Sequence, residues 1–80
     1  MREVYIIIEE NIDKLFSNYI GVADSKENYE AMINEYYGLD VVDLSEKMYG
    51  GSLVECVYRF YSDGDEINVN VFNRVINKLQ

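Results

Sequence analysis

The sequence predicts an α+β fold: a small two-layer domain in which a mostly antiparallel sheet of about four strands packs on one main helix. Three observations carry this prediction. Strand-like segments occur in pairs near each end of the chain, one amphipathic helical pattern separates the pairs, and an Asp-Gly turn joins the second pair. With 80 residues and no linker-like stretch, the chain has room for one core, so we expect a single domain over residues 1–80.

The first pair of segments is expected to form two strands joined by a turn. Residues 3–10 are apolar on both faces. One face carries Val4, Ile6 and Ile8, and the other carries Tyr5 and Ile7. This pattern predicts a central strand that is covered on each side. Residues 11–14 are polar enough to turn, and residues 15–23 are expected to form the second strand.

An amphipathic helix is expected between residues 24 and 38. Asp24 and Glu27 form an Asp-x-x-Glu variant of the capping box, Ser25 is a competing N-cap, and Gly38 lies where a left-handed residue ends a helix. The sheet-facing stripe follows the i, i+3, i+4, i+7 template: Tyr29, Met32, Ile33 and Tyr36. The opposite side is largely acidic: Glu27, Glu30, Asn34 and Glu35.

Two segments are less regular. Residues 39–51 fit a short strand or a packed loop through the apolar residues Leu39, Val41, Val42 and Leu44. Alternatively, Asp43 and Glu46 cap a single helical turn that ends at Gly50 and Gly51, and the sequence leaves both interpretations open. At the other end, a short C-terminal helix is predicted from the spacing of Phe72, Val75, Ile76 and Leu79.

Residues 52–61 and 66–72 are expected to form a hairpin, because Asp63-Gly64 favours a type I′ turn between them. The predicted pairs are Tyr61 with Glu66, Phe60 with Ile67 and Tyr58 with Val69. One face of this hairpin is then apolar, with Cys56, Tyr58, Phe60, Ile67, Val69 and Val71, and the other carries Arg59, Asn68 and Asn70. A slip of one residue would mix these faces, so the register should hold.

The chain is strongly acidic, with 15 Asp and Glu against 7 Lys and Arg and a net charge of −8. Such a surface repels phosphate, so we expect no direct binding of nucleic acid and no binding to anionic membranes. The longest wholly apolar run, residues 4–8, is far too short to span a bilayer, and the N-terminus carries no signal-peptide pattern. A single cysteine favours a reducing compartment, so we expect a cytoplasmic protein.

Neither enzymatic nor metal chemistry is expected. The chain has no histidine, which removes the commonest general base and metal ligand, and one cysteine cannot complete a structural zinc site. No glycine-rich phosphate-binding motif is present. We therefore expect no catalytic residues, no metal site and no cofactor. Cys56 is interpreted as a small buried hydrophobe, the carboxylates of residues 63–66 as turn residues rather than calcium ligands, and residues 9–13 as a solvated turn.

Acidic charge is concentrated between residues 24 and 46, against Lys26 alone. The acidic residues of this stretch are Asp24, Glu27, Glu30, Glu35, Asp40, Asp43 and Glu46. Tyrosine is also abundant. Tyr37 and Tyr49 are expected near the ends of elements, where a phenol can contact a partner, whereas Tyr29, Tyr36 and Tyr58 are assigned to the core. These acidic residues with Tyr37 and Tyr49 are the predicted partner-binding set, and an ordinary solvated helix face is the alternative.

Residues 4–37 resemble a group of small phage and low-GC bacterial proteins. The likeness lies in the hairpin Val4-Tyr5-Ile6-Ile7-Ile8 … Tyr19-Ile20-Gly21-Val22 and in the helix start Asp24-Ser25-Lys26-Glu27-Asn28-Tyr29-Glu30-Ala31. This group implies no activity. In size, charge and aromatic content, the chain is also similar to the small acidic anti-CRISPR and anti-defence proteins of phages, which implies a place in the host bacterial cell.

The function expected from these observations is that of a non-enzymatic inhibitor. Its acidic, Tyr-bearing face would bind the basic nucleic-acid-binding surface of a protein partner, such as a CRISPR effector. The alternative is a small homo-oligomeric structural or assembly module, for example a homodimer, that associates through an exposed sheet edge or the Tyr-bearing face. A regulatory small-ligand binder, with its pocket at a dimer interface, is a third hypothesis.

Overall fold

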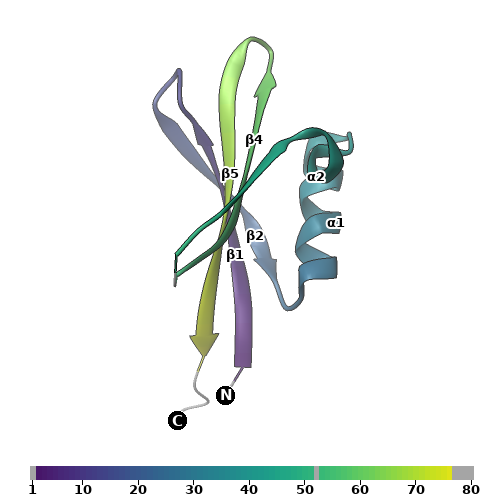
Figure 1. Cartoon of the computed structure of the whole chain (residues 1–80), viewed down its shortest axis with the longest axis vertical. Coiled ribbons are helices and arrows are strands. Elements are labelled where there is room, and N and C mark those ends of the chain that lie inside the picture. Colours follow the sequence, from purple (N-terminus) through teal and green to yellow (C-terminus); the bar gives the residue numbers. More distant parts are fainter. Residues whose placement is uncertain (1, 52, 77–80) are drawn as a thin grey trace.

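The chain folds as an antiparallel sheet with one main helix and one short helix at its side (Figure 1). The computed structural model describes residues 2–51 and 53–76. In this part of the chain the elements are β1 (Arg2–Asn11), β2 (Phe16–Ala23), α1 (Lys26–Tyr37), α2 (Val41–Leu44), β3 (Glu46–Tyr49), β4 (Val54–Ser62) and β5 (Asp65–Ile76). The predicted α+β class is confirmed. The sheet has five strands rather than about four, because β3 adds a short edge strand.

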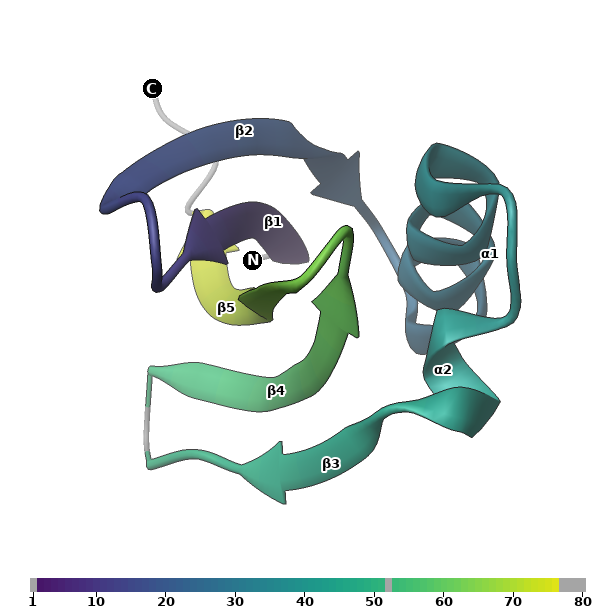
Figure 2. The ribbon, with the colours of Figure 1, turned by 90° about the horizontal axis from the view of Figure 1, so that it is seen from above.

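The first and last strands pair with each other at the centre of the sheet. β1 runs antiparallel to β5 along its whole length, from Arg2 opposite Ile76 to Asn11 opposite Ile67. β2 flanks β1, and β4 and β3 follow β5, which gives the order β2-β1-β5-β4-β3. The sheet is strongly twisted, and β2 and β3 lie on opposite sides of the central pair (Figure 2). The predicted central position of the first strand is therefore confirmed.

The hydrophobic core lies between the helices and one face of the sheet. Tyr29 and Ile33 of α1 and Val41 of α2 are fully buried there. The sheet contributes buried side chains from its three inner strands: Ile7, Cys56, Tyr58, Ile67, Val69 and Val71. α1 lies beside β2 and α2 lies near β4 (Figure 2). Among the described residues, no helix is long and apolar enough to cross a membrane.

Both ends of α1 follow local sequence signals. The N-cap is Ser25, whose Oγ accepts a hydrogen bond from the Asn28 backbone N–H at 3.1 Å. Asp24, the other candidate cap, instead accepts from the Asn28 side-chain amide at 2.6 Å. At the C-terminal end, Gly38 has φ 70° and its N–H donates to the Asn34 carbonyl. The predicted helix end is confirmed, and the competition between two N-caps is resolved in favour of Ser25.

The predicted apolar stripe of α1 is wrong at its last turn. Tyr29 and Ile33 are buried as expected and Met32 is half-buried, but Tyr36 is 49% exposed. Tyr37 takes its place against the sheet, where its ring packs edge-on against Phe60 with centroids 5.0 Å apart. Glu9 of the sheet accepts a hydrogen bond from the Tyr37 hydroxyl at 2.6 Å, and this contact favours Tyr37 on the inner side of the helix.

Residues 39–51 form a helical turn and a strand, but both predicted positions are wrong: residues 41–44, expected as a strand or packed loop, are helical, and residues 46–49, placed by the alternative in a helical turn, form a strand. α2 is a single helical turn, and β3 follows it directly. The cap of this turn is Asp40, whose side chain accepts from the Asp43 N–H at 3.3 Å; the predicted cap at Asp43 is wrong. β3 then pairs with β4, from Glu46 opposite Arg59 to Tyr49 opposite Cys56.

The register of the last hairpin is confirmed. Tyr61 lies opposite Glu66, Phe60 opposite Ile67, and Tyr58 opposite Val69. Asp63 and Gly64 have φ angles of 53° and 83°, which matches the two positive angles of a type I′ turn. The predicted C-terminal helix is wrong in the described residues, because β5 continues as a strand to Ile76, paired with β1. Leu79 lies outside the described residues.

Docking of α1 on the sheet should dominate the stability of the domain. Ile33→Ala removes a fully buried side chain and is expected to lower the free energy of unfolding by about 2–5 kcal/mol. Leu44→Ala, at a position that is 74% exposed, should change it by less than about 0.5 kcal/mol. Urea unfolding followed by circular dichroism measures both, and equal losses would contradict this packing.

Candidate protein-binding surface

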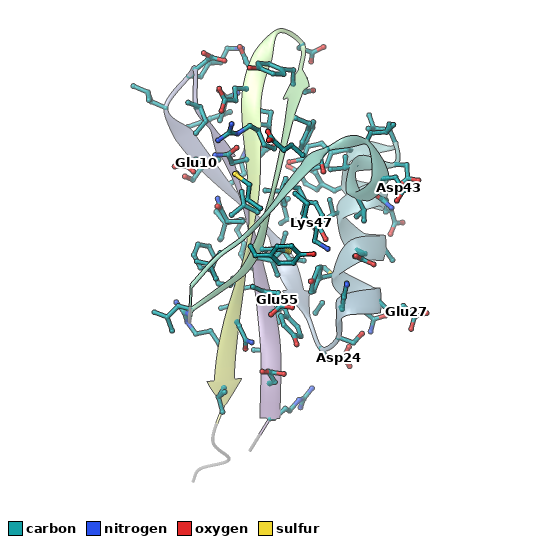
Figure 3. All side chains as sticks on the ribbon, viewed as in Figure 1. Glu10, Asp24, Glu27, Asp43, Lys47 and Glu55 are labelled. Atoms are coloured by element: carbon teal, nitrogen blue, oxygen red, sulfur yellow. The ribbon has the colours of Figure 1, made fainter. Side chains whose placement is uncertain are left out.

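The acidic residues predicted to bind a partner fall into three groups. Asp24, Glu27 and Glu35 are exposed on or beside α1. Asp40, Asp43 and Glu46 are exposed around α2 and the start of β3. Figure 3 shows Glu27 and Asp43 on the side of the helices away from the sheet, and Asp24 at the turn that precedes α1. Glu30, in the third group, is half-buried between α1 and the sheet.

Glu30 and Tyr37 join α1 to the sheet. Glu30 Oε2 accepts a hydrogen bond from the Tyr58 hydroxyl at 3.4 Å. The Tyr37 hydroxyl donates to Glu9 Oε2 at 2.6 Å, and Glu9 Oε1 accepts from the Asn18 amide at 2.9 Å. The structure thus places both residues where they position the helix, beneath the surface formed by the exposed carboxylates.

Glu9 and Asn11 are buried polar residues that sequence reasoning missed. Their exposed fractions are 9% and 6%, so the expected solvated turn is wrong at these positions. Asn11 donates to Asp65 Oδ2 at 3.1 Å and accepts from the Lys14 N–H at 2.8 Å. The alternation of β1 indicates this burial, because Glu9 and Asn11 lie on the same face of the strand as Tyr5 and Ile7.

The surface around α2 contains an apolar groove of 390 Å³, here called the α2 groove. Its apolar lining consists of Leu39, Val41, Leu44, Phe60 and Tyr61. Leu44 is 74% exposed and Tyr61 is 71% exposed, and both line this one groove. Tyr37 packs behind the groove against Phe60. The helix and the strand therefore hold an apolar concavity open to solvent.

The charged lining of the groove is one acid and one base, Glu46 and Arg59, and the exposed Asp40 and Asp43 flank its apolar lining residues in the sequence. Within the described part of the chain, neither Asp40 nor Asp43 forms an ion pair. Glu46, 68% exposed at its side chain, lies 3.8 Å from Arg59 Nη1, and Arg59 Nε lies 3.4 Å from Glu66 Oε2. One arginine is thus shared between two acids. An apolar centre with a charged rim is the usual composition of a protein–protein interface.

Tyr49 is not brought to the α2 groove. It lies at the far end of β3, 79% exposed and opposite Cys56. Lys47 Nζ sits 5.4 Å from the Tyr49 ring centroid and 5.5 Å from that of Tyr58. Figure 3 shows Lys47 between the sheet and α1. The Lys47 ammonium thus lies over both rings, and Tyr49 remains an exposed aromatic at the end of β3, away from the α2 groove.

Burial strongly raises the pKa of the phenols of Tyr29, Tyr37 and Tyr58 above the ordinary value of 10. Hydrogen bonding adds to this effect, from Cys56 for Tyr29 and from Glu9 for Tyr37. Cys56 itself is 1% exposed, with Sγ 3.6 Å from the Tyr29 hydroxyl, so its predicted role as a buried hydrophobe is confirmed. Among the described residues, no three acidic or cysteine side chains are grouped to hold a metal ion.

Comparison with known proteins does not extend these observations. No protein-family model matches the chain, and no curated protein and no solved structure shows a significant match.

The buried phenols predict loss of stability in alkali. Unfolded tyrosines ionise near pH 10, whereas Tyr29, Tyr37 and Tyr58 stay protonated in the fold because their pKa values are raised. The unfolded chain then binds fewer protons, so the free energy of unfolding should be unaffected by these groups below pH 10 and fall as the pH rises above it. Urea unfolding at a series of pH values measures the slope. Tyr58→Phe should make it shallower, and an unchanged slope would contradict the burial of this hydroxyl.

Proposed function

We propose that this protein is a non-enzymatic inhibitor that binds the basic, nucleic-acid-binding surface of a protein partner. The observation that carries the proposal is the α2 groove, where exposed apolar side chains lie beside Glu46 and the Arg59 it shares with Glu66. The exposed carboxylates of Asp40 and Asp43 belong to the same segment and form no ion pair within the described residues. A groove of this composition fits a surface that presents an apolar side chain among lysines and arginines. Nucleic-acid-binding proteins carry such basic surfaces because they must neutralise phosphates.

The two parts of the surface have different physical roles. The net charge of −8 attracts a basic partner over a long range and speeds association. Glu27 and Glu35 add a second acidic strip along α1, separated by about 12 Å along the helix axis at 1.5 Å per residue. Lasting affinity comes from the apolar contacts of the groove, where Leu44 and Tyr61 can be buried. Binding should therefore be fast, sensitive to salt and anchored at α2.

CRISPR effector nucleases are the first partners to test, because the resemblance to phage anti-CRISPR proteins rests on the same size, charge and aromatic content. Such a nuclease exposes a positively charged channel for its nucleic acids. An acidic domain seated in that channel would block binding of DNA without any chemistry of its own. This mode of action needs neither a catalytic residue nor a cofactor.

The proposal predicts inhibition of DNA binding by at least one effector in a panel of purified CRISPR nucleases and other DNA-binding proteins. Inhibition should weaken as the salt concentration rises from about 0.05 to about 0.5 M, because screening shortens the range of the attraction. Fluorescence anisotropy of labelled DNA measures it. Inhibition that does not change over this range, or no inhibition across the panel, would contradict the proposal.

Substitutions at the α2 groove and at a control site test which surface of the chain causes the inhibition. Asp43→Lys and Leu44→Ala should each weaken inhibition about tenfold, the first through the rim and the second through the apolar contact. Glu10→Lys is the matched control, since it makes the same charge change at an exposed site away from α2 (Figure 3). If Glu10→Lys weakens inhibition as much as Asp43→Lys, net charge alone is responsible and the α2 groove is not the site.

A further inference from the structure

The outer side of β2 is a free strand edge. Among the described residues, β2 pairs only with β1, and no other strand lies against its outer side. Its sequence from Phe16 to Ala23 contains no charged residue, and residues 16–19 are all exposed. A free edge of this kind offers unpaired backbone groups to another strand. The opposite edge, β3, has four residues and carries Glu46 and Lys47, which protect it against such pairing.

An apolar tip stands at the start of this edge. The tip is formed by Lys14, Leu15 and Phe16, where the chain turns from β1 to β2. Leu15 is 87% exposed with φ 59°, a left-handed conformation that is costly for a branched side chain, and Phe16 is 45% exposed. The Leu15 N–H donates to the Asn11 carbonyl at 2.9 Å, which fixes this turn. The fold therefore holds two apolar side chains in water beside a lysine.

A groove of 430 Å³ lies at the other end of β2, between the strand and α1, and is here called the α1 groove. Val22, Ala31 and Met32 give it apolar walls. Asp24 and Glu35 place two exposed carboxylates at the same groove, and neither forms an ion pair within the described part of the chain. Arg2 also lines the groove, so two carboxylates face one base, and the remaining negative charge suits an apolar segment with a positive charge.

The tip has the chemistry that the α1 groove would accept. Leu15 and Phe16 match the apolar walls, and Lys14, 66% exposed at its side chain, matches the carboxylates. Lys14 already contacts Asp65 at 2.8 Å, but an ammonium group has three donors and can bind a second acid. The tip and the groove cannot meet within one copy, because they lie at opposite ends of β2.

We propose that the chain forms a two-fold symmetric homodimer through β2. Antiparallel pairing of two β2 strands, centred near Tyr19, brings Phe16 of each copy beside Val22 of the other and so places each tip in the other copy's α1 groove. The contact is self-complementary, as a two-fold dimer requires. Each copy has a net charge of −8, but β2 itself contains no charged residue, so two paired β2 strands bring no like charges together.

The tip–groove contacts, more than the strand pairing, should determine the strength of the dimer. Ile20 has no partner in β1, since Ile7 lies opposite Gly21 and Ile8 opposite Tyr19. Such a β-bulge bends an edge strand and limits regular pairing along it. The energy is therefore assigned to burial of Leu15 and Phe16 at both ends of the interface, with Tyr19 in the middle.

The dimer is independent of the proposed inhibitory function. The α2 groove lies near β4 and β3, on the side of the sheet opposite β2 (Figure 2). A dimer would present two α2 grooves, one on each copy. Loss of dimerisation alone should leave each groove intact, so the two proposals can fail separately.

Sedimentation velocity and light scattering across a range of protein concentrations test the dimer. The wild-type protein should move from the monomer mass to twice that mass as its concentration rises. Leu15→Asn should weaken dimerisation at least about tenfold, because it removes the apolar tip. Asn adopts left-handed angles more readily than Leu, so thermal stability measured on the monomer should be unchanged or higher. Ala31→Arg should weaken dimerisation to a similar extent by filling the α1 groove and repelling Lys14.

Mixing the Leu15→Asn and Ala31→Arg variants tests directly whether each tip binds the other copy's α1 groove. The Leu15→Asn copy keeps its α1 groove and the Ala31→Arg copy keeps its tip, so a mixed dimer retains one intact contact. It should form more tightly than either variant alone and more weakly than the wild type. A wild-type protein that stays monomeric at millimolar concentration, or a dimer that both variants leave unchanged, would overturn the proposal.

Discussion

The pairing of β1 with β5 is the constraint on which the rest of the molecule depends. It joins the first and last strands through ten residue pairs, from Arg2 opposite Ile76 to Asn11 opposite Ile67. With these two strands at the centre, β2 and β3 must be the edges, and α1 and α2 must cover the face that carries Ile7, Val69 and Tyr58. Both grooves form where a helix meets the outer part of this sheet.

Local signals made part of this fold predictable. The register of the last hairpin followed from Asp63-Gly64 and from an alternation that only one pairing keeps intact, and Gly38 marked the end of α1. The β1–β5 pairing is non-local, and no nearby turn fixes it. Without that pairing in view, the spacing of Phe72, Val75 and Ile76 fits a helix as well as a strand, which is why the C-terminal segment was assigned wrongly.

The candidate surface was predictable in its charge but not in its shape. Asp40, Asp43 and Glu46 were identified from the sequence and are exposed together around α2. Glu30 and Tyr37 belong to the same acidic and aromatic pattern, yet Tyr58 and Glu9 of the sheet draw them inward by hydrogen bonds. The apolar centre of the α2 groove depends on Leu44 and Tyr61 lining the same concavity, and sequence spacing does not reveal that these distant residues share it.

We propose that this chain takes the place of nucleic acid on its partner, and a competition experiment tests this proposal. Binding of the chain to an effector that it inhibits would be measured at increasing concentrations of a DNA duplex that the effector recognises. The apparent affinity of the chain should fall in proportion to the DNA added, and no complex should hold both the chain and the DNA. A stable complex of effector, DNA and chain together would contradict it.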